Sequence, residues 1–284
     1  MSYETLITAQ DLSGLCAHTP VLVVDCRHDL MDKQKGHRAY AQSHLPNAVF
    51  ADVERDLSDL TKQGLGRHPL PDAEAFAATL ARWGYGAQQQ IVAYDDGSGA
   101  YAARLWWMLR LIGHRDVAVL DGGFAAWTAA DLPLTTEVPP EAASVMDLGW
   151  SFDNVVYAQE LERLLLDNVE VLLLDARGAP RFRGEVEPID PVAGHVPGAF
   201  NRPFTENLDA SGRFKHADEL REEFSALLGN REPRHVVHMC GSGVTACHNL
   251  LAMEHAGLPG SRVFAPSWSG WIADPARPVA RAAA

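Results

Sequence analysis

One cysteine lies in a segment whose residue types suit nucleophilic chemistry. The apolar run 235–239 predicts a buried strand, and Cys240 follows it with Gly241-Ser242-Gly243 before a predicted helix. The two glycines let the backbone curl so that amide N–H groups point toward the sulfur, and the helix adds its positive end. Such surroundings favour a thiolate. We therefore predict that Cys240 is a reactive nucleophile, against the alternative of an inert cysteine at a strand end.

The other candidate ligands near this segment do not form a recognisable metal or dithiol motif. The chain has four cysteines and no CxxC pair: Cys16, Cys26, Cys240 and Cys247. His238 and His248 also stand nearby, but the predicted strand and helix separate these side chains, so a shared ion would distort the turn. No metal or other cofactor is expected. Cys247 either packs in the core or forms a disulfide with Cys240 after oxidation.

The elements that position this turn occur twice in the chain. The run Val21-Leu-Val-Val-Asp25-Cys-Arg27 matches Val171-Leu-Leu-Leu-Asp175-Ala-Arg177, and both end in Asp-x-Arg. The His-x-Pro elements at His44 and His195 follow in the same order. Matches of this kind at one offset, about 150 residues, indicate a fold-sized internal repeat.

The repeat extends to the turn itself. Ile91-Val-Ala-Tyr-Asp-Asp96-Gly-Ser-Gly99 resembles the segment around Cys240, and we interpret Asp96 as the residue that stands where the second half has Cys240. The first half is therefore expected to lack the nucleophile.

Alternating strands and helices predict an α/β fold. The apolar runs lack polar alternation, which indicates parallel strands that are buried on both faces. Amphipathic helices are expected over residues 71–83, 156–166 and 216–228. Proline-rich sequence after Pro133 suggests a linker. We expect a first domain at 1–138, a linker at 139–150 and a catalytic domain at 151–284.

Composition excludes several classes of protein. Hydrophobic residues make up 47% of the 284 residues and charged residues 21%, as in a globular protein. The formal net charge of -13 disfavours nucleic acid and anionic membrane surfaces as partners. The sequence shows neither a signal peptide nor a membrane-spanning run, so a cytoplasmic protein is expected.

These segments resemble one known family. Cys240-Gly-Ser-Gly-Val-Thr-Ala246 is similar to the active-site loop of the 3-mercaptopyruvate sulfurtransferases, within the tandem-domain rhodanese superfamily. The likeness covers essentially the whole chain, including these further segments: both Asp-x-Arg strands, both His-x-Pro elements, Arg104–Met108 and Leu120–Phe124. It implies two rhodanese-like domains, each a mainly parallel sheet flanked by helices. The first of them has lost its catalytic cysteine.

The resemblance also implies roles for particular residues. Arg181 matches the arginine that binds the anionic group of the sulfur donor, with Arg183 as a competitor and an ion pair to Glu185 or Glu187 as the structural alternative. Three residues match a proton relay: Ser242, His68 and Glu54, the last of which stands where the family has an aspartate. The loop residues complete the expected donor site: Gly241, Gly243, Val244 and Thr245.

The implied activity is transfer of a sulfane sulfur from a small anionic donor through a Cys240 persulfide. The acceptor would be cyanide, a small thiol or thioredoxin, and the kinetics would be ping-pong. The loop favours mercaptopyruvate over thiosulfate, because thiosulfate rhodaneses place basic residues directly after the cysteine. However, mercaptopyruvate enzymes carry a second arginine shortly before the second His-x-Pro element, and the segment Gly184–His195 has none.

Two further activities remain as alternatives. A Cys-x5-Arg phosphatase is disfavoured, because Ala246 stands where the phosphate-binding arginine would be. A sulfur-relay module that accepts persulfide from a partner protein would use the same loop.

Overall fold

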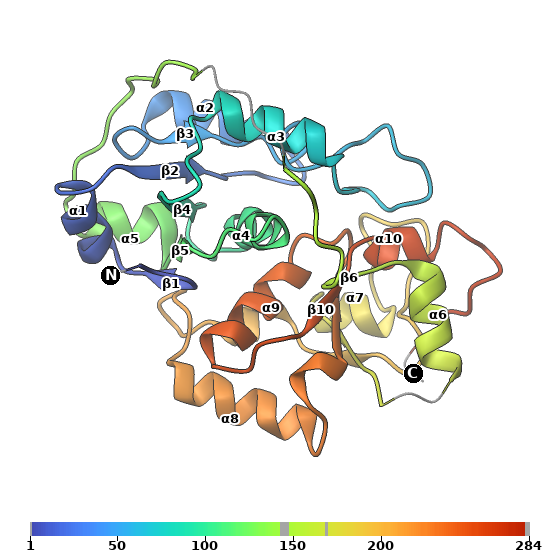
Figure 1. Cartoon of the computed structure of the whole chain (residues 1–284). Coiled ribbons are helices and arrows are strands. Elements are labelled where there is room, and N and C mark those ends of the chain that lie inside the picture. Colours follow the sequence, from blue (N-terminus) through green and yellow to red (C-terminus); the bar gives the residue numbers. More distant parts are fainter. Residues whose placement is uncertain (1, 143–147, 168–169, 282–284) are drawn as a thin grey trace. The chain divides into compact units, whose positions relative to one another are not determined.

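The computed structural model describes residues 2–142, 148–167 and 170–281 (Figure 1). The chain forms two compact units. Unit 1 comprises Met1–Asp59, Leu70–Ser151 and Ala210–Phe214, and unit 2 comprises Leu60–Pro69, Phe152–Asp209 and Lys215–Ala284. Each unit therefore contains one short segment from the other half of the sequence.

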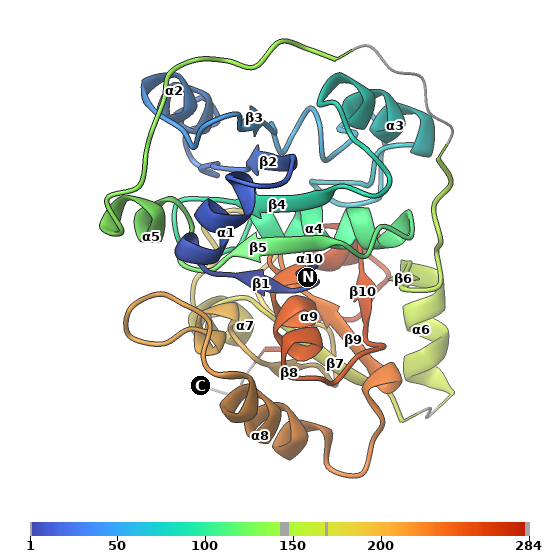
Figure 2. The ribbon, with the colours of Figure 1, turned by 60° about the vertical axis from the view of Figure 1, so that its left-hand side comes forward.

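Unit 1 is built on a parallel five-stranded sheet. The strand order is β1-β5-β4-β2-β3, and Figure 2 shows β3, β2, β4, β5 and β1 following one another down the unit. The strands are β1 (Leu6–Ile7), β2 (Val21–Asp25), β3 (Val49–Phe50), β4 (Gln90–Tyr94) and β5 (Val117–Leu120). The central strands β2 and β4 are buried almost throughout, as their uninterrupted apolar sequences predict.

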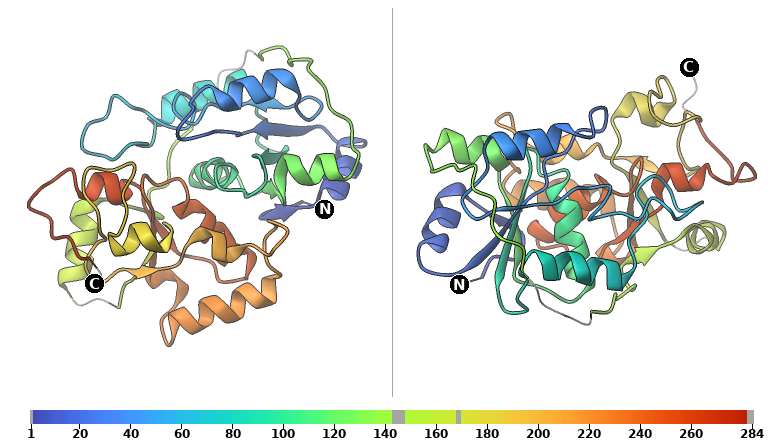
Figure 3. Two further views of the ribbon diagram at one scale, coloured as in Figure 1. Left: turned by 180° about the vertical axis from the view of Figure 1, so that it is seen from behind. Right: turned by 90° about the horizontal axis from the view of Figure 1, so that it is seen from above.

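Helices lie on both sides of the strands in unit 1 (Figure 3). They are α1 (Ala9–Cys16), α2 (Lys35–Gln42), α3 (Ala73–Arg82), α4 (Ala102–Leu111) and α5 (Gly123–Ala129). The predicted helix at 71–83 is thus α3. Helix α4 is buried on nearly every residue and packs against β4 and β5.

Unit 2 repeats this plan. Its sheet is also parallel, with the order β6-β10-β9-β7-β8. The strands are β6 (Val155–Val156), β7 (Leu172–Asp175), β8 (Phe200–Asn201), β9 (Val236–Met239) and β10 (Arg262–Phe264). The helices are α6 (Ala158–Leu166), α7 (Ala179–Arg183), α8 (Ala217–Leu228), α9 (Ala246–His255) and α10 (Ser267–Trp271), with 3-10 turns η1 (Phe204–Asn207) and η2 (Pro233–His235). The other two predicted helices are α6 and α8, and α9 packs against β9 and β10 as α4 does in unit 1.

The Asp-x-Arg elements have matching structural roles in the two units. In unit 1, Arg27 is 3% exposed, pairs with Asp25 at 2.6 Å and donates to the Ser43 carbonyl at 2.7 Å. In unit 2, Arg177 pairs with Asp175 at 2.7 Å and donates to the carbonyl of a loop glycine, Gly194, at 2.8 Å. The fully satisfied ion pair ties each strand end to a neighbouring loop.

The His-x-Pro histidines are structural as well. His44 bonds the Tyr40 carbonyl through Nδ1 at 2.8 Å and stacks on the Tyr40 ring at 3.9 Å. His195 makes the same pair of contacts with Phe182, at 2.8 Å and 3.9 Å. Both motifs on which the repeat was recognised therefore hold the fold together.

The register of the sheets corrects one detail of the repeat. In unit 1, Tyr94 pairs with Asp25, and in unit 2, Met239 pairs with Asp175. The residue that follows each strand is therefore Asp95 or Cys240, so the prediction that Asp96 stands in the place of Cys240 was wrong by one position. The first loop has one residue more before its helix begins, which hid this shift in the sequence.

Candidate active site

Cys240 lies at the carboxyl end of β9, in the loop that leads to α9. Cys240 is 2% exposed, and the Gly243 N–H donates to its Sγ at 3.2 Å. The Cys240 carbonyl accepts from the Trp268 N–H at 2.9 Å. The sulfur is therefore held by the main chain of its own loop, in a position where a backbone N–H can stabilise negative charge.

Glycine is required at the fourth residue of the loop. Gly243 has a φ of +81°, and a Cβ atom there would lie 2.2 Å from the Ala265 carbonyl oxygen. Any side chain would therefore displace the amide that faces the sulfur. Val244 is buried at the end of the loop, and Thr245 is the residue before α9.

Ser267 contacts the cysteine from the next loop and was not predicted from the sequence. Its Oγ accepts from the Cys240 N–H at 3.1 Å, donates to the Phe264 carbonyl at 2.9 Å and lies 4.0 Å from the sulfur. Ser267 has a φ of +51°, which is unusual for a residue other than glycine. A side chain kept at this costly backbone position is typical of a functional site.

The loop serine and a distant histidine form a pair. Ser242 Oγ and His68 Nδ1 lie 2.8 Å apart, and the two residues are 6% and 4% exposed. The segment that carries His68 belongs to unit 2 although it comes from the first half of the chain. The structure therefore brings together two of the three residues expected to form a relay. A buried hydroxyl and imidazole in contact can hold or pass a proton.

Glu54 belongs to unit 1. Its carboxylate pairs with the exposed Lys33 at 2.8 Å. Its part in a relay stays a prediction.

Arg181, the residue expected to bind the donor, lies against the loop. A Cβ atom placed on Gly241 would lie 3.6 Å from both Nη atoms of Arg181. The guanidinium is held by Glu187 at 2.7 Å and by Asp190 at 3.1 Å. Arg181 therefore forms the ion pair with Glu187 and also lies beside the loop, so the ion pair does not exclude donor binding.

Arg183 is placed differently. Its side chain is 43% exposed and pairs with the exposed Glu185 at 2.6 Å. The position beside Gly241 distinguishes Arg181 from this neighbour.

The two carboxylates that bind Arg181 have further hydrogen-bond donors. Asp190 accepts from Arg67 Nη1 as well as from Arg181, and its side chain is 3% exposed. In Glu187, the Arg181 guanidinium and backbone N–H groups outweigh burial and hold the pKa of the carboxyl below its usual value. Both carboxylates serve as buried anchors for arginines near the loop.

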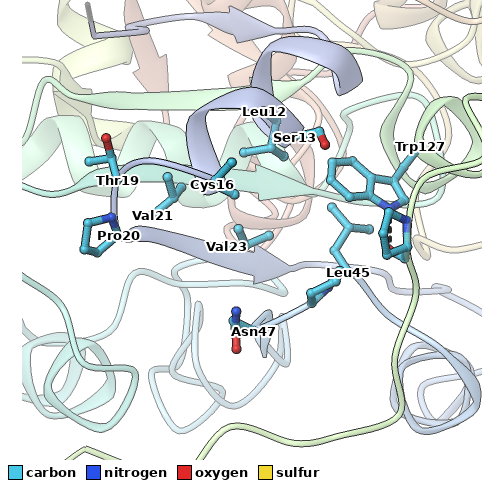
Figure 4. A pocket seen from close by; sticks show the side chains of 13 residues that line it. Leu12, Ser13, Cys16, Thr19, Pro20, Val21, Val23, Leu45, Asn47 and Trp127 are labelled. Atoms are coloured by element: carbon cyan, nitrogen blue, oxygen red, sulfur yellow. Dashed lines mark hydrogen bonds between the residues drawn. The ribbon is translucent and has the colours of Figure 1, made fainter.

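Two of the three remaining cysteines lie in surroundings that disfavour a thiolate. Burial raises the pKa of Cys26 well above its ordinary value, and nearby carboxylates add to the effect. Burial also raises the pKa of Cys16, which lines an apolar pocket of about 480 Å³ in unit 1 with Leu12, Val23 and Trp127 (Figure 4). Cys247 is buried in α9 and donates to the Gly243 carbonyl at 3.3 Å.

The histidines near the loop have other partners. His238 contacts Ser261 Oγ at 3.1 Å, and His248 contacts Asn207 at 3.1 Å. Among the residues that the structure describes, no group of three or more His, Cys, Asp or Glu side chains could hold a metal ion. Within the same ranges, no helix has the length and apolar character needed to cross a bilayer.

Comparison with known proteins agrees with this arrangement. The family profile of the rhodanese-like domain matches residues 8–130 and 157–274. A protein of Pseudomonas aeruginosa assigned as a 3-mercaptopyruvate sulfurtransferase is 49% identical over 292 residues, which covers 99% of each chain. A protein of Mycobacterium tuberculosis assigned as a thiosulfate sulfurtransferase is 41% identical over 289 residues, covering 99% of this chain and 98% of the relative.

Solved structures give the same result. The 3-mercaptopyruvate sulfurtransferase of Escherichia coli superposes with a TM-score of 0.79 at 30% identity, covering 93% of this chain and 98% of that one. The enzyme of the same name from Leishmania major gives a TM-score of 0.82 at 31% identity, covering 94% and 73%.

Proposed function

The chain belongs to the rhodanese-like family as a tandem-domain sulfurtransferase, and we propose that it moves sulfur from 3-mercaptopyruvate to a thiol or cyanide through a persulfide on Cys240. The observation that carries this proposal is the loop after β9. There the Gly243 N–H points at the Cys240 sulfur at 3.2 Å, and the Arg181 guanidinium lies against Gly241. The proposed nucleophile therefore belongs to the loop against which the proposed donor-binding guanidinium lies.

In the first step the Cys240 thiolate attacks the sulfur of the donor. The S–S bond forms as the C–S bond of mercaptopyruvate breaks, and the electron pair leaves with the carbon as the enolate of pyruvate. A proton then converts the enolate into pyruvate. The Ser242 and His68 pair is suited to supply that proton, because its two buried groups are in contact at 2.8 Å.

In the second step an acceptor attacks the outer sulfur of the persulfide. A thiolate takes it as a new persulfide and cyanide takes it as thiocyanate, and the Cys240 thiolate is regenerated. Arg181 would bind the donor carboxylate by paired hydrogen bonds. Gly241, Val244 and Thr245 would shape the loop around the donor. The reaction needs no metal or organic cofactor.

Thiosulfate is a second candidate donor. The relative from Mycobacterium tuberculosis that is assigned as a thiosulfate sulfurtransferase covers essentially the whole chain at 41% identity. The residues that follow Cys240 carry no positive charge, so a dianion would depend on arginines from other segments. We favour mercaptopyruvate for this reason.

The deciding experiment measures kcat/KM for mercaptopyruvate and thiosulfate side by side, with cyanide as the common acceptor. The proposal expects the higher value for mercaptopyruvate. A higher value for thiosulfate would assign the enzyme to that donor. Transfer that occurs only from a partner desulfurase, with neither small donor turned over, would instead identify a sulfur-relay module.

Arg181→Met tests the binding role, with Arg183→Gln as the matched control. Loss of a charged contact to the donor should raise KM about tenfold to a hundredfold while kcat changes little. The control should behave as the parent, because Arg183 pairs with Glu185 at the surface. Equal effects of the two substitutions would exclude Arg181 as the donor-binding residue.

We also propose functional boundaries and a location. The first domain would span 1–138, the linker 139–150 and the catalytic domain 151–284, in the cytoplasm, with thioredoxin among the acceptors. Limited proteolysis that cuts first within 139–150 would support the boundaries.

A further inference from the structure

Unit 1 contains a pocket that the proposed sulfur transfer does not use. Its volume is about 390 Å³, and its walls come from α2, β3, the end of α3 and the chain segment 138–141. Figure 2 shows the chain after α5 passing above α2 at the top of unit 1. A pocket of this size is large enough for a small organic molecule.

One part of the pocket is aromatic. The aromatic residues that line it come from three elements: His37 and Tyr40 of α2, Phe50 of β3 and Trp83 at the end of α3. The Phe50 ring centroid lies 5.8 Å from that of His37 and 5.4 Å from that of Tyr40. Rings grouped in this way favour a flat, apolar ligand body, which they can contact by face or by edge.

The pocket is also lined by two arginines that share one buried carboxylate. Asp56 is 2% exposed and accepts from Arg55 Nε at 3.1 Å, from Arg55 Nη2 at 3.2 Å and from Arg82 Nη2 at 2.7 Å. The Asp52 N–H donates to Asp56 as well, at 2.8 Å. Asp56 therefore holds both guanidinium groups, and Nη1 of each arginine makes no hydrogen bond within the described ranges.

A carboxylate that lines the pocket leaves Arg82 available. Glu141 Oε1 lies 3.8 Å from Arg82 Nε, which is too long for a hydrogen bond, and the Glu141 side chain is 79% exposed. An exposed ion pair of this kind contributes little in water. A ligand that carries an anionic group can therefore compete with Glu141 for the guanidinium.

The chain segment that lines the pocket is fixed at both ends. Before it, His44 Nε2 contacts the Glu137 carbonyl at 3.0 Å. After it, the Ala142 N–H donates to the Arg82 carbonyl at 3.0 Å. The segment 138–141 thus forms a wall that exists before a ligand arrives, which lowers the entropy cost of binding.

We propose that this pocket binds a small aromatic carboxylate, with its ring against the aromatic residues and its carboxylate on Arg55 and Arg82. Two guanidinium groups with unused donors suit a carboxylate, because each donates a charged hydrogen bond to it. A neutral molecule of the same shape would gain only the aromatic contacts. Every residue of the site belongs to unit 1, so the inference does not depend on the proposed function, which uses Cys240 of unit 2.

Calorimetric titration of the full chain tests the ligand class. The probes are 2-naphthoate and 2-naphthamide, which have the same ring system and differ in charge. We expect one site for 2-naphthoate and binding about tenfold weaker for 2-naphthamide, the loss expected for one charged hydrogen bond. Equal binding of the two probes, or no binding of 2-naphthoate at millimolar concentration, would overturn the inference.

Arg82→Gln tests the anionic end of the site. The variant should bind 2-naphthoate about tenfold more weakly and should leave the binding of 2-naphthamide nearly unchanged. Arg38→Gln is the matched control and should bind both probes as the parent does, because Arg38 is an exposed residue of α2 that pairs with Asp32. Equal effects of the two substitutions on 2-naphthoate would exclude Arg82 as its partner.

Ala41→Trp tests the cavity without removing any charge, and it serves if Arg82→Gln does not fold. Ala41 is an exposed residue of α2 that lines the pocket, so an indole there should fill the space and weaken binding of both probes more than tenfold. Gln42→Trp is the control, because Gln42 is exposed on the same helix but does not line the pocket. Parental affinity in Ala41→Trp would contradict the proposal.

Arg181→Met distinguishes this site from the donor site. It should bind 2-naphthoate as tightly as the parent, since Arg181 belongs to unit 2. If Arg181→Met abolishes binding while Arg82→Gln does not, the probe occupies the donor site and the inference fails. Failure of mercaptopyruvate turnover would leave the titrations unaffected, so the two proposals are tested separately.

Discussion

The loops that follow β4 and β9 have the same place in their sheets but hold different side chains. Asp95 is fully buried in the first loop, and its carboxylate accepts from four backbone N–H groups: those of Gly97 at 3.1 Å, Gly99 at 2.9 Å, Tyr101 at 2.9 Å and Ala102 at 3.4 Å. Cys240 in the second loop receives the Gly243 N–H on its sulfur at 3.2 Å. Both loops therefore direct main-chain N–H groups at the first residue after the strand.

The first loop shows what such a loop binds. Its N–H groups already bind a carboxylate that the chain itself supplies. Burial raises the pKa of Asp95, and the four N–H groups act in the opposite direction. In the second loop the smaller thiol takes this place, so the same type of loop can stabilise a thiolate or a persulfide.

The two loops also differ in what surrounds them. Gly123 in unit 1 corresponds to Ser267 in unit 2, since Phe124 and Trp268 donate equivalent hydrogen bonds to Asp95 and Cys240. A Cβ atom on Gly123 would lie 2.5 Å from the Asp95 carbonyl oxygen, whereas Ser267 places a hydroxyl on Cys240 at a similar positive φ. The reactive loop is thus distinguished by added side chains as well as by its cysteine.

Cys240→Ser should have the largest effect, because it removes the nucleophile and leaves the loop intact. We expect kcat for sulfur transfer to fall by about a thousandfold or more. A thiocyanate assay with mercaptopyruvate and cyanide measures the loss. The melting temperature should stay close to that of the parent, since the two side chains have similar volume.

The first loop supplies the control for this experiment. Asp95→Cys in the Cys240→Ser background places a thiol at the equivalent strand end, where the arginines and Ser267 are missing. We expect no recovery of transfer. Substantial activity in either variant would mean that position 240 is not what makes the second loop reactive.

Asp95→Ala should affect stability rather than chemistry. Four backbone N–H groups, two of them buried and two half-buried, would lose their acceptor, which should cost about 3 kcal/mol of unfolding free energy. Faster amide hydrogen exchange at Gly97, Gly99 and Tyr101 would locate the loss. Asp96→Ala is the matched control, because Asp96 is exposed and should change stability by less than about 0.5 kcal/mol. A larger loss in the control would contradict the sheet register that assigns Asp95 to the position of Cys240.

The repeat and the fold class could be predicted because both follow from short segments of the sequence. Continuous apolar runs such as Val21–Asp25 encode buried parallel strands, and the motifs at their ends recur in the same order. The one-residue difference between the loops was not visible, because Asp95 and Asp96 are identical in type. The pairing of Tyr94 with Asp25 in the folded sheet distinguishes them.

Site residues within the loop after β9 could be predicted from the sequence. Site residues from distant segments were harder to predict. Cys240 and Ser242 are adjacent to the glycines that mark the turn. Arg67 stands next to His68 in the sequence, but nothing local indicates that its segment packs in unit 2 beside Gly241. Asp190 was missed for the same reason, since its role depends on two arginines that are distant from each other in the chain.

Ser242→Ala should sharpen the comparison between the loops by removing one helper and keeping the nucleophile. The variant loses the contact of Ser242 Oγ with His68 Nδ1, so kcat should fall by about a hundredfold with KM nearly unchanged. The pH profile of kcat should change shape as well, which a purely structural serine would not cause. Ser98→Ala in the first loop is the control and should leave both kinetic constants at parental values. A fall in kcat of less than about twofold in Ser242→Ala would remove the pair from the mechanism.

The strands that carry the two loops differ at a buried histidine. His238 in β9 pairs in register with Leu174, and the residue at the corresponding position of β4 is Ala93, which pairs with Val24. Burial lowers the pKa of His238 from its ordinary value of 6.5 to about 3. The unfolded chain therefore binds a proton below pH 6.5 that the folded protein does not, and the stability that His238 contributes is lost as the pH falls from 6.5 toward 3.

His238→Ala makes β9 resemble β4 at this position and should weaken the dependence of stability on pH. For the parent, the His238 contribution to the unfolding free energy should fall by about 2 kcal/mol between pH 7 and pH 5, because each unit of pKa difference is worth about 1.4 kcal/mol. The variant should be less stable at pH 7, since it leaves a cavity, but should lose correspondingly less on acidification. Urea titrations at the two pH values measure the difference, and replacing the exposed His18 with Gln should leave the parental dependence unchanged. If His238→Ala loses as much stability as the parent over this range, the buried imidazole is not the group that makes unit 2 sensitive to acid, and the two strands behave alike despite their sequences.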